Sequence, residues 1–276
     1  MNIRLMFITR DPEVGKIAQR AGIDWIFVDL EYRGKDIRQA NRDTVISAHT
    51  IADVAAIRSV IKQSKLLVRI NPLGPWSKDE INDVISAGAD IIMLPFFKRA
   101  IEVKEFISFV DKRAETCLLV ETMAAVKNIN SILSIDGIDY LHIGLNDLHI
   151  ERGTTFMFEF LSDGSMDELA EHIKRKNIPF GFGGMARIGE LIPPAECILA
   201  EHYRLGSSGV ILSRHFCNSS KFENYQKLEE SVISGVRSIR ELEEELLKKP
   251  AEFFEKNRLD VNNYIAQLVA SIQSKK

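Results

Sequence analysis

Eight short apolar runs alternate with segments of helical periodicity, and this rhythm constrains the fold more than any other feature of the chain. Most of the runs are continuously apolar, which is typical of strands buried on both faces of a parallel sheet. They lie at 4–9, 25–30, 66–70, 91–95, 117–121, 140–144, 179–183 and 209–213. The intervening segments are amphipathic and end at Gly or Asn, which suit helix C-caps, as at 77–88, 126–137 and 166–177. Eight βα units predict a TIM barrel, an α/β fold.

The chain length fits one barrel with a tail. At 276 residues, 45% of them hydrophobic, the chain can bury one large core, and barrels of this size commonly form a single domain. We therefore predict a catalytic barrel over residues 1–218 and a C-terminal helical extension over 219–276. Apolar residues of the extension recur at three- and four-residue spacing, so one helix face needs a partner. Homo-oligomer contacts are the favoured interpretation and packing within the chain is the alternative.

One connection is longer than a usual βα loop. The stretch from Gly34 to Val60 opens with the polar and charged run GKDIRQANRD. It is interpreted either as an active-site flap or as a solvated insertion.

Charge and cysteine usage exclude several classes of partner. The net charge of −3 gives no electrostatic footprint for nucleic acid. Three widely separated cysteines, Cys117, Cys197 and Cys217, are typical of reduced thiols. The N-terminus resembles no signal peptide, and no run approaches the roughly 18 apolar residues of a membrane span. A soluble, cytoplasmic protein with no membrane partner is expected.

Charged and amide side chains follow four of the predicted strands. They are Asp29 and Glu31 at the end of the second run, Arg69 at the end of the third, Glu121 at the end of the fifth, and Asn146 and Asp147 just beyond the sixth. The C-terminal ends of barrel strands form the active-site face, so these side chains are expected at one mouth. The alternative for each is a surface or structural ion pair.

Two of these residues, Glu121 and Asp147, predict a metal site. Carboxylate oxygens are the ligands that Mg²⁺ or Mn²⁺ prefers. A cation held there would chelate a 2-oxo acid and stabilise the enolate formed when a carbon–carbon bond breaks. Arg69 would complement the enolate oxygen. The turn of Gly144, Leu145, Asn146 and Asp147 would aim backbone N–H groups at the substrate carboxylate.

Five segments resemble the HpcH/HpaI aldolase and citrate lyase family, in the right order over roughly residues 10 to 217. They are DWIFVDLEY (24–32), LVRINP (67–72), AGADIIMLP (87–95), VETMAAVKN (120–128) and GIDYLHIGLNDLH (137–149). The resemblance implies a (β/α)₈ barrel and a divalent metal on Glu121 and Asp147. It also implies an enolate-stabilising Arg69, and backbone amides of Asn146 and Asp147 for a pyruvoyl carboxylate. Trimer-based oligomers with exchanged terminal helices are common in the family.

The chain departs from the family pattern at the proton-transfer position. Tyr32 stands where the 2-oxo acid aldolases have a histidine, and a phenol of pKa about 10 cannot simply replace imidazole near pH 7. Tyr32 could act only if a cation such as Arg33 lowered its pKa. His49 and His149 lie on mouth-side segments and are the alternative candidates. Asp29 and Glu31 complete the set of catalytic candidates.

A family glutamine is replaced by Leu119, and the PPxGxRG segment of the family is absent. Because these departures reshape the pocket, the family substrate is not assumed.

The sequence thus predicts a Mg²⁺- or Mn²⁺-dependent carbon–carbon lyase acting through the enolate of a pyruvate-like 2-oxo acid, with an aldehyde as second substrate. One alternative is a CoA-thioester lyase of the citrate or malyl-CoA type. Another is an inactive, metabolite-binding barrel, which the tyrosine at position 32 supports. The presence of Glu121, Asp147 and Arg69 together argues against that last interpretation.

Overall fold

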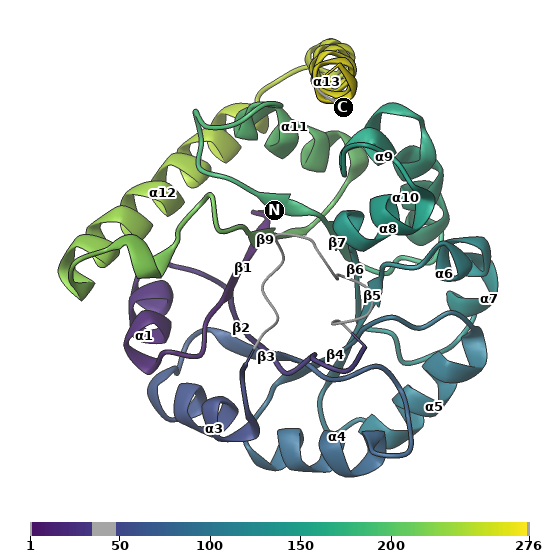
Figure 1. Ribbon diagram of the computed structural model, residues 1–276, viewed down its shortest axis with the longest axis vertical. Helices are drawn as coiled ribbons and strands as arrows, with labels where there is room; N and C mark the ends of the chain where they lie inside the picture. Colours follow the sequence, from purple (N-terminus) through teal and green to yellow (C-terminus); the bar gives the residue numbers. More distant parts are fainter. Residues whose placement is uncertain (1, 35–47, 275–276) are drawn as a thin grey trace.

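The structure, a computed structural model, describes residues 2–34 and 48–274. In these residues nine parallel strands form a ring surrounded by helices (Figure 1). The strands are β1 (Arg4–Ile8), β2 (Trp25–Asp29), β3 (Lys65–Arg69), β4 (Ile91–Leu94), β5 (Glu115–Val120), β6 (Tyr140–Ile143), β7 (Phe180–Phe182), β8 (Gly184–Met185) and β9 (Gly209–Leu212). The predicted barrel is confirmed.

The helices lie outside this ring. They are α1 (Pro12–Arg20), α3 (Ile51–Val60), α4 (Ser77–Ser86), α5 (Ala100–Val110), α6 (Met123–Lys127), α7 (Ile129–Ile132), α8 (Leu145–Arg152), α9 (Glu159–Ser162), α10 (Ser165–Lys174), α11 (Ala195–Leu205), α12 (Tyr225–Leu246) and α13 (Ala251–Gln273). A short 3₁₀ helix spans Ser219–Lys221.

The barrel closes through a strand that is broken in two. The expected strand at 179–183 divides at Gly183, whose φ of 55° no longer fits an extended backbone. Before the break β7 pairs with β6, and after it β8 pairs with β9. The amide of Ser208 also donates to the carbonyl of Phe180 at 2.7 Å. The count of eight strands is therefore corrected to nine, because one glycine changes direction where the ring closes.

Alternate residues of the strands fill the barrel interior. Met6, Phe27 and Leu67 belong to this inner cluster, which is separate from the larger core between strands and helices. Tyr140 also points inward, with its ring edge-on to Trp25 at 4.9 Å between centroids. The interior is therefore packed below the mouth.

The inward phenol requires glycine on two neighbouring strands. A Cβ added at Gly181 would lie 2.2 Å from the carbonyl oxygen of Gly209 and 2.6 Å from the Tyr140 hydroxyl. A Cβ added at Gly209 would lie 2.2 Å from the same hydroxyl. The two glycines therefore make the space that Tyr140 occupies.

The long connection after β2 contains the ordinary crossover helix of the second unit. Residues 51–60 form α3, which begins with a capping box between Thr50 and Asp53. This part of the connection is therefore neither a flap nor an insertion. Residues 35–47, on which the flap prediction also depends, lie outside the described residues.

The first helix of the C-terminal extension belongs to the barrel wall. Figure 1 shows α12 between α1 and α11. Its apolar residues Leu228, Val232 and Ile239 are buried in the main core. Its buried Glu243 accepts hydrogen bonds from the Ile3 amide at 2.6 Å and from the Tyr203 hydroxyl at 2.9 Å. The apolar face of α12 is thus covered within the chain, where oligomer contacts were the favoured interpretation.

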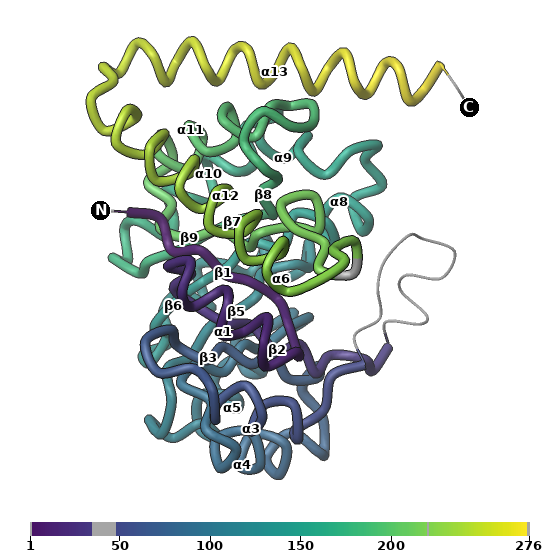
Figure 2. The backbone as a smooth tube through the Cα atoms, turned by 90° about the vertical axis from the view of Figure 1, so that its left-hand side faces the viewer, coloured from purple at the N-terminus to yellow at the C-terminus, as the bar shows by residue number. Residues whose placement is uncertain are grey.

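The last helix lies across the outside of this wall. Figure 2 shows α13 running along one side of the molecule. The side chain of Asn257 donates to the Cys197 carbonyl at 3.0 Å and to Glu201 at 2.9 Å, which anchors α13 on α11. Oligomer contacts through α13 stay a prediction. Within residues 2–34 and 48–274, no helix is both long and apolar enough to cross a membrane.

We expect Gly181→Ala to destabilise the protein by at least about 2 kcal/mol, because backbone must move to admit the methyl group. The matched control is Gly184→Ala, since a Cβ there meets nothing nearer than 3.6 Å. Its free energy of unfolding should stay within about 1 kcal/mol of the wild type. Urea unfolding measures both, and equal stabilities would contradict the close approach of β7 and β9.

Candidate active site

A largely buried arginine lies between two carboxylates at the mouth of the barrel. Arg69 ends β3 beside Asp29, which ends β2. Its Nε and Nη2 atoms donate to the two carboxylate oxygens of Asp29, each at 2.8 Å. Its Nη1 lies 3.3 Å from Oε2 of Glu31. This bidentate geometry fixes the plane of the guanidinium.

The charges around Arg69 decide its protonation. Burial alone would lower the pKa of Arg69, but the negative charges of Asp29 and Glu31, with a smaller effect from Glu121, raise it well above its ordinary value. Arg69 is therefore a permanent positive charge. A guanidinium carries five N–H groups, so it can hold Asp29 and Glu31 and still donate to a substrate oxygen.

Glu121 follows β5 and is only 3% exposed. Its Oε1 accepts a hydrogen bond from the Phe96 amide at 3.0 Å. Phe96 has a φ of 54°, an uncommon conformation for a residue with a side chain. A Cβ added at Gly144 would lie 2.8 Å from the Glu121 Cβ. The strand ends of β5 and β6 are therefore in contact here, and glycine at 144 leaves room for the carboxylate.

The GLND segment begins a helix, which corrects its interpretation as a turn. Gly144 is the N-cap of α8, and Leu145, Asn146 and Asp147 form the first helical turn. The first N–H groups of a helix have no acceptor within it, and the helix dipole favours an anion there. The expected role of the segment in binding a carboxylate is therefore compatible with its helical geometry.

The donor set fits a hard divalent cation. Glu121 follows β5 and Asp147 lies in the first turn of α8, directly after β6, while three further side chains, Asp29, Glu31 and Arg69, lie at the ends of β2 and β3. With all four carboxylates ionised, they carry four negative charges against the single positive charge of Arg69, which leaves an excess of three negative charges. No group of three or more His, Cys, Asp or Glu that could hold a metal occurs among the described residues. Mg²⁺ is commonly bound by two carboxylates, and water and substrate oxygens then complete its coordination shell.

His49 contacts the backbone at the end of β2. Its Nδ1 accepts a hydrogen bond from the Asp29 amide at 3.0 Å. An amide can only donate, so Nδ1 is unprotonated and the proton of a neutral His49 lies on Nε2. The ring thus holds the backbone of Asp29, the residue whose carboxylate binds Arg69.

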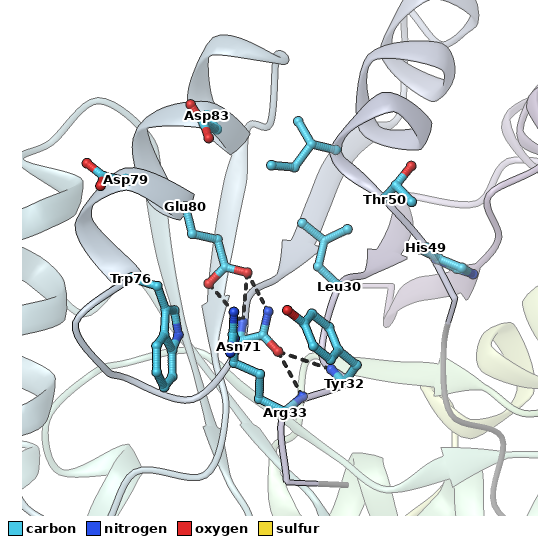
Figure 3. Close-up of a pocket in the computed structure, with 11 residues that line it drawn as sticks. Leu30, Tyr32, Arg33, His49, Thr50, Asn71, Trp76, Asp79, Glu80 and Asp83 are labelled. Carbon is cyan, nitrogen blue, oxygen red and sulfur yellow. Dashed lines mark hydrogen bonds between the residues drawn. The ribbon is translucent and has the colours of Figure 1, made fainter. Parts of the chain in front are cut away.

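Tyr32 lines a pocket of about 400 Å³ beside β2 and β3, together with His49 (Figure 3). The side chain of Tyr32 is 50% exposed, and its ring lies 5.1 Å from the Arg33 guanidinium carbon. The same guanidinium lies 4.3 Å above the Trp76 ring. The structure therefore places Tyr32 in an aromatic wall of this pocket.

Asn71 and Glu80 hold this wall, and the sequence analysis missed both. The Asn71 Oδ1 accepts from the amides of Tyr32 and Arg33, at 3.1 and 3.0 Å. The Asn71 Nδ2 donates to Glu80 at 2.6 Å, as Figure 3 shows. Burial raises the pKa of Glu80, although the hydrogen bonds from Asn71 and the charge of Arg33 oppose this. The asparagine in LVRINP was the available signal, but its partner lies nine residues away on a helix.

His142 lies inside the barrel, near the break in its wall. It follows the inward-facing Tyr140 by two residues on β6, and its Nε2 lies 3.1 Å from the Gly183 carbonyl oxygen. Nδ1 is buried and has no hydrogen-bond partner in the described part of the chain. Burial, opposed by the Gly183 hydrogen bond and reinforced by Arg69, lowers the pKa of His142 to about 4. His142 is therefore neutral near pH 7.

The remaining candidate for proton transfer lies on α8. His149 is half-buried, and its Nδ1 lies 3.4 Å from the Thr154 carbonyl oxygen. The structure thus brings Arg69, Asp29, Glu31 and His49 together by direct contacts, and Glu121 with Gly144.

The barrel and the charged strand ends define the class of (β/α)₈-barrel proteins with an acidic, arginine-containing mouth. A family model described as HpcH/HpaI aldolase/citrate lyase matches residues 4–161, more than half of the chain. The chain therefore belongs to the HpcH/HpaI aldolase/citrate lyase family, which confirms the resemblance seen in the sequence.

Similar proteins include two aldolases and a solved structure. A hydroxypyruvate/pyruvate aldolase of Roseovarius nubinhibens is 27% identical over 195 residues, which are 59% of this chain and 67% of that protein. A hydroxypyruvate/pyruvate aldolase of Roseobacter denitrificans is 27% identical over 169 residues, 50% of this chain and 60% of that one. The chain thus spans about two thirds or less of their length. A crystal structure of an HpcH/HpaI aldolase from Desulfitobacterium hafniense has a TM-score of 0.61 at 18% identity, covering 87% of this chain and 93% of that one.

Acid should destabilise the fold through His142. Between pH 6.5 and 4 an unfolded histidine takes up a proton while the buried one does not, so stability falls as pH falls. The wild type should lose free energy of unfolding between pH 7 and about pH 4.5, and His142→Phe should reduce this loss by roughly 2 to 3 kcal/mol. Urea unfolding at both pH values measures this. His172→Asn on α10 is the control, and an unchanged loss in His142→Phe would show that the ring is not buried as described.

Proposed function

We propose that the protein is a divalent-metal-dependent aldolase that makes or breaks a carbon–carbon bond next to the enolate of a pyruvate-like 2-oxo acid. The observation that carries this proposal is the placement of Arg69 among Asp29, Glu31 and Glu121 at the strand ends. Membership of an aldolase and lyase family and the similarity to pyruvate aldolases support it.

In this proposal Glu121 and Asp147 hold Mg²⁺ or Mn²⁺. The bound cation supplies a Lewis acid that stabilises negative charge on the substrate. Asp147 also lies in the first turn of α8, with Leu145 and Asn146. The amides of this turn bind the substrate carboxylate, which orients the 2-oxo acid in the mouth.

Arg69 stabilises the oxygen on which charge develops as the enolate forms. Its plane is fixed before substrate arrives, because Asp29 binds two of its nitrogen atoms. Such preorganised donors lower the barrier without reorganising during the reaction. Glu31 and His49 support the arginine and Asp29 respectively, and the Nε2 proton of His49 is the one that we assign to proton transfer. Tyr32 is assigned to the wall of the neighbouring pocket.

The proposal predicts that Glu121→Gln weakens Mn²⁺ binding by more than about 100-fold, because an amide is a poorer ligand for a hard cation. Calorimetry with Mn²⁺, with and without oxalate as an enolate mimic, measures this. Asp83→Asn, an exposed carboxylate on α4, is the control and should bind like the wild type. Wild-type protein that binds no Mn²⁺ or Mg²⁺ would overturn the proposal.

Arg69→Lys should slow enolate formation by roughly 100- to 1000-fold, since lysine keeps the charge but loses the fixed fork of donors. The exchange of pyruvate methyl protons in D₂O, followed by NMR, measures enolate formation directly. Thermal unfolding of the variant controls for the loss of the contacts to Asp29. Exchange at the wild-type rate in a folded variant would exclude Arg69 from the reaction.

A further inference from the structure

An apolar pocket of about 320 Å³ lies beside β8 and the end of β9, whereas the pocket of Tyr32 lies beside β2 and β3. Three loops form most of its wall: 156–158 after α8, 191–193 before α11, and the segment after β9, through Ser213 and His215. Its volume is at the lower end of the range for pockets that bind small molecules. Of the described residues that line it, none is Lys, Arg, Asp or Glu.

The strand directions connect this pocket with the barrel mouth. Ile211 on β9 packs against the inner cluster of the barrel. Pairing continues past the end of β9, because the Ser213 amide donates to the Met185 carbonyl at 2.9 Å. Alternate residues of a strand face the same side, so Ser213 faces the mouth. A Cβ at Gly184 would lie 3.6 Å from the Ser213 Cβ, so both line the pocket from this side.

The pocket also adjoins the turn that we assign to the substrate carboxylate. A Cβ added at Gly183 would lie 3.1 Å from Cδ1 of Leu145 and 3.6 Å from Cε1 of Phe158. Leu145 belongs to the first turn of α8, and Phe158 belongs to the pocket wall. The side chains of Leu145 and Phe158 thus meet beside Gly183, next to the wall of the pocket.

The rim of the pocket carries apolar side chains where polar ones would be expected. Leu191 is 52% exposed and Ile192 is 59% exposed. Leu191 also has a φ of 70°, a left-handed conformation that leucine rarely adopts. Strained backbone of this kind persists only where the surrounding structure maintains it, and it is concentrated at ligand sites. The rim therefore resembles a binding surface more than a solvated loop.

We propose that this pocket binds the uncharged, apolar chain of the aldehyde that reacts with the enolate. The inference rests on the proposed aldolase function and names the class of its second substrate, an alkyl or aryl aldehyde. In the condensation a methyl proton of pyruvate is removed, and the resulting carbon bonds to the aldehyde carbonyl carbon. The aldehyde oxygen then takes up one proton, so that a 4-hydroxy-2-oxo acid forms from the two reactants without other products.

A series of unbranched aldehydes tests the proposal. With full-length, Mn²⁺-loaded protein and pyruvate, kcat/KM should rise about fourfold for each added methylene from acetaldehyde to hexanal, as expected for burial of a CH₂ group. Glyoxylate, which is short and charged, should react more slowly than hexanal. A flat series, or a preference for glyoxylate, would overturn the proposal.

Leu191→Asn removes an apolar rim residue and should be well tolerated, since asparagine accepts a positive φ more readily than leucine. It should lower kcat/KM for hexanal at least fivefold and change that for acetaldehyde less than twofold. Leu259→Gln is the matched control, because Leu259 is 55% exposed on α13. If kcat/KM depends on aldehyde length in Leu191→Asn as it does in the wild type, the pocket does not bind the aldehyde chain.

Gly184→Val provides a second variant that does not depend on the rim. Because a Cβ at Gly184 meets only ordinary contacts, the added side chain should fold in and narrow the pocket. It should disfavour hexanal relative to acetaldehyde, and an unchanged ratio would contradict the assignment.

Pyruvate methyl exchange in D₂O distinguishes a failure of the pocket assignment from a failure of the proposed aldolase function. The pocket assignment is supported if exchange is normal in the wild type and in both variants while the dependence of kcat/KM on aldehyde length changes in the variants. If exchange is normal and the dependence of kcat/KM on aldehyde length is the same in the variants as in the wild type, the pocket does not bind the aldehyde. The proposed aldolase function is then unaffected. Absence of exchange in the Mn²⁺-loaded wild type overturns both.

Discussion

The buried positive charge of Arg69 is the constraint on which the mouth of the barrel depends. Removing one partner of a buried ion pair typically costs about 3–5 kcal/mol, so the neighbours of such a charge must be held firmly in place. His49 holds the backbone of Asp29, and Asn71 holds the segment that follows Glu31. The residues at these strand ends are therefore held in place around the Arg69 guanidinium, either by direct contact or through its partners.

This arrangement also gives the mouth a surplus of negative charge. Three nearly buried carboxylates, Asp29, Glu31 and Glu121, surround a single arginine. An arginine needs only one carboxylate for a bidentate pair, so a purely structural role would not call for three. The surplus of negative charge favours a cation.

The barrel and its charged strand ends were predictable from the sequence, because apolar runs and the residues that terminate them are local features. The family was predictable for the same reason. Contacts between distant segments were not: Asn71 binds the backbone of Tyr32 and Arg33, and the apolar pocket combines three loops that share no pattern. The division of one strand at Gly183 depends on barrel closure. The helical geometry of 144–147 was missed because a glycine and an asparagine suggest a turn when they are considered alone.

The break at Gly183 has a consequence for the way in which such an enzyme could diversify. Beside this glycine lie Leu145, in the turn that we assign to the substrate carboxylate, and Phe158, in the wall of the apolar pocket. Substitutions in the loops at 156–158 and 191–193 would alter the choice of partner molecule without moving the strand ends that carry Arg69 and Glu121. Natural selection could therefore act on specificity and on reactivity independently.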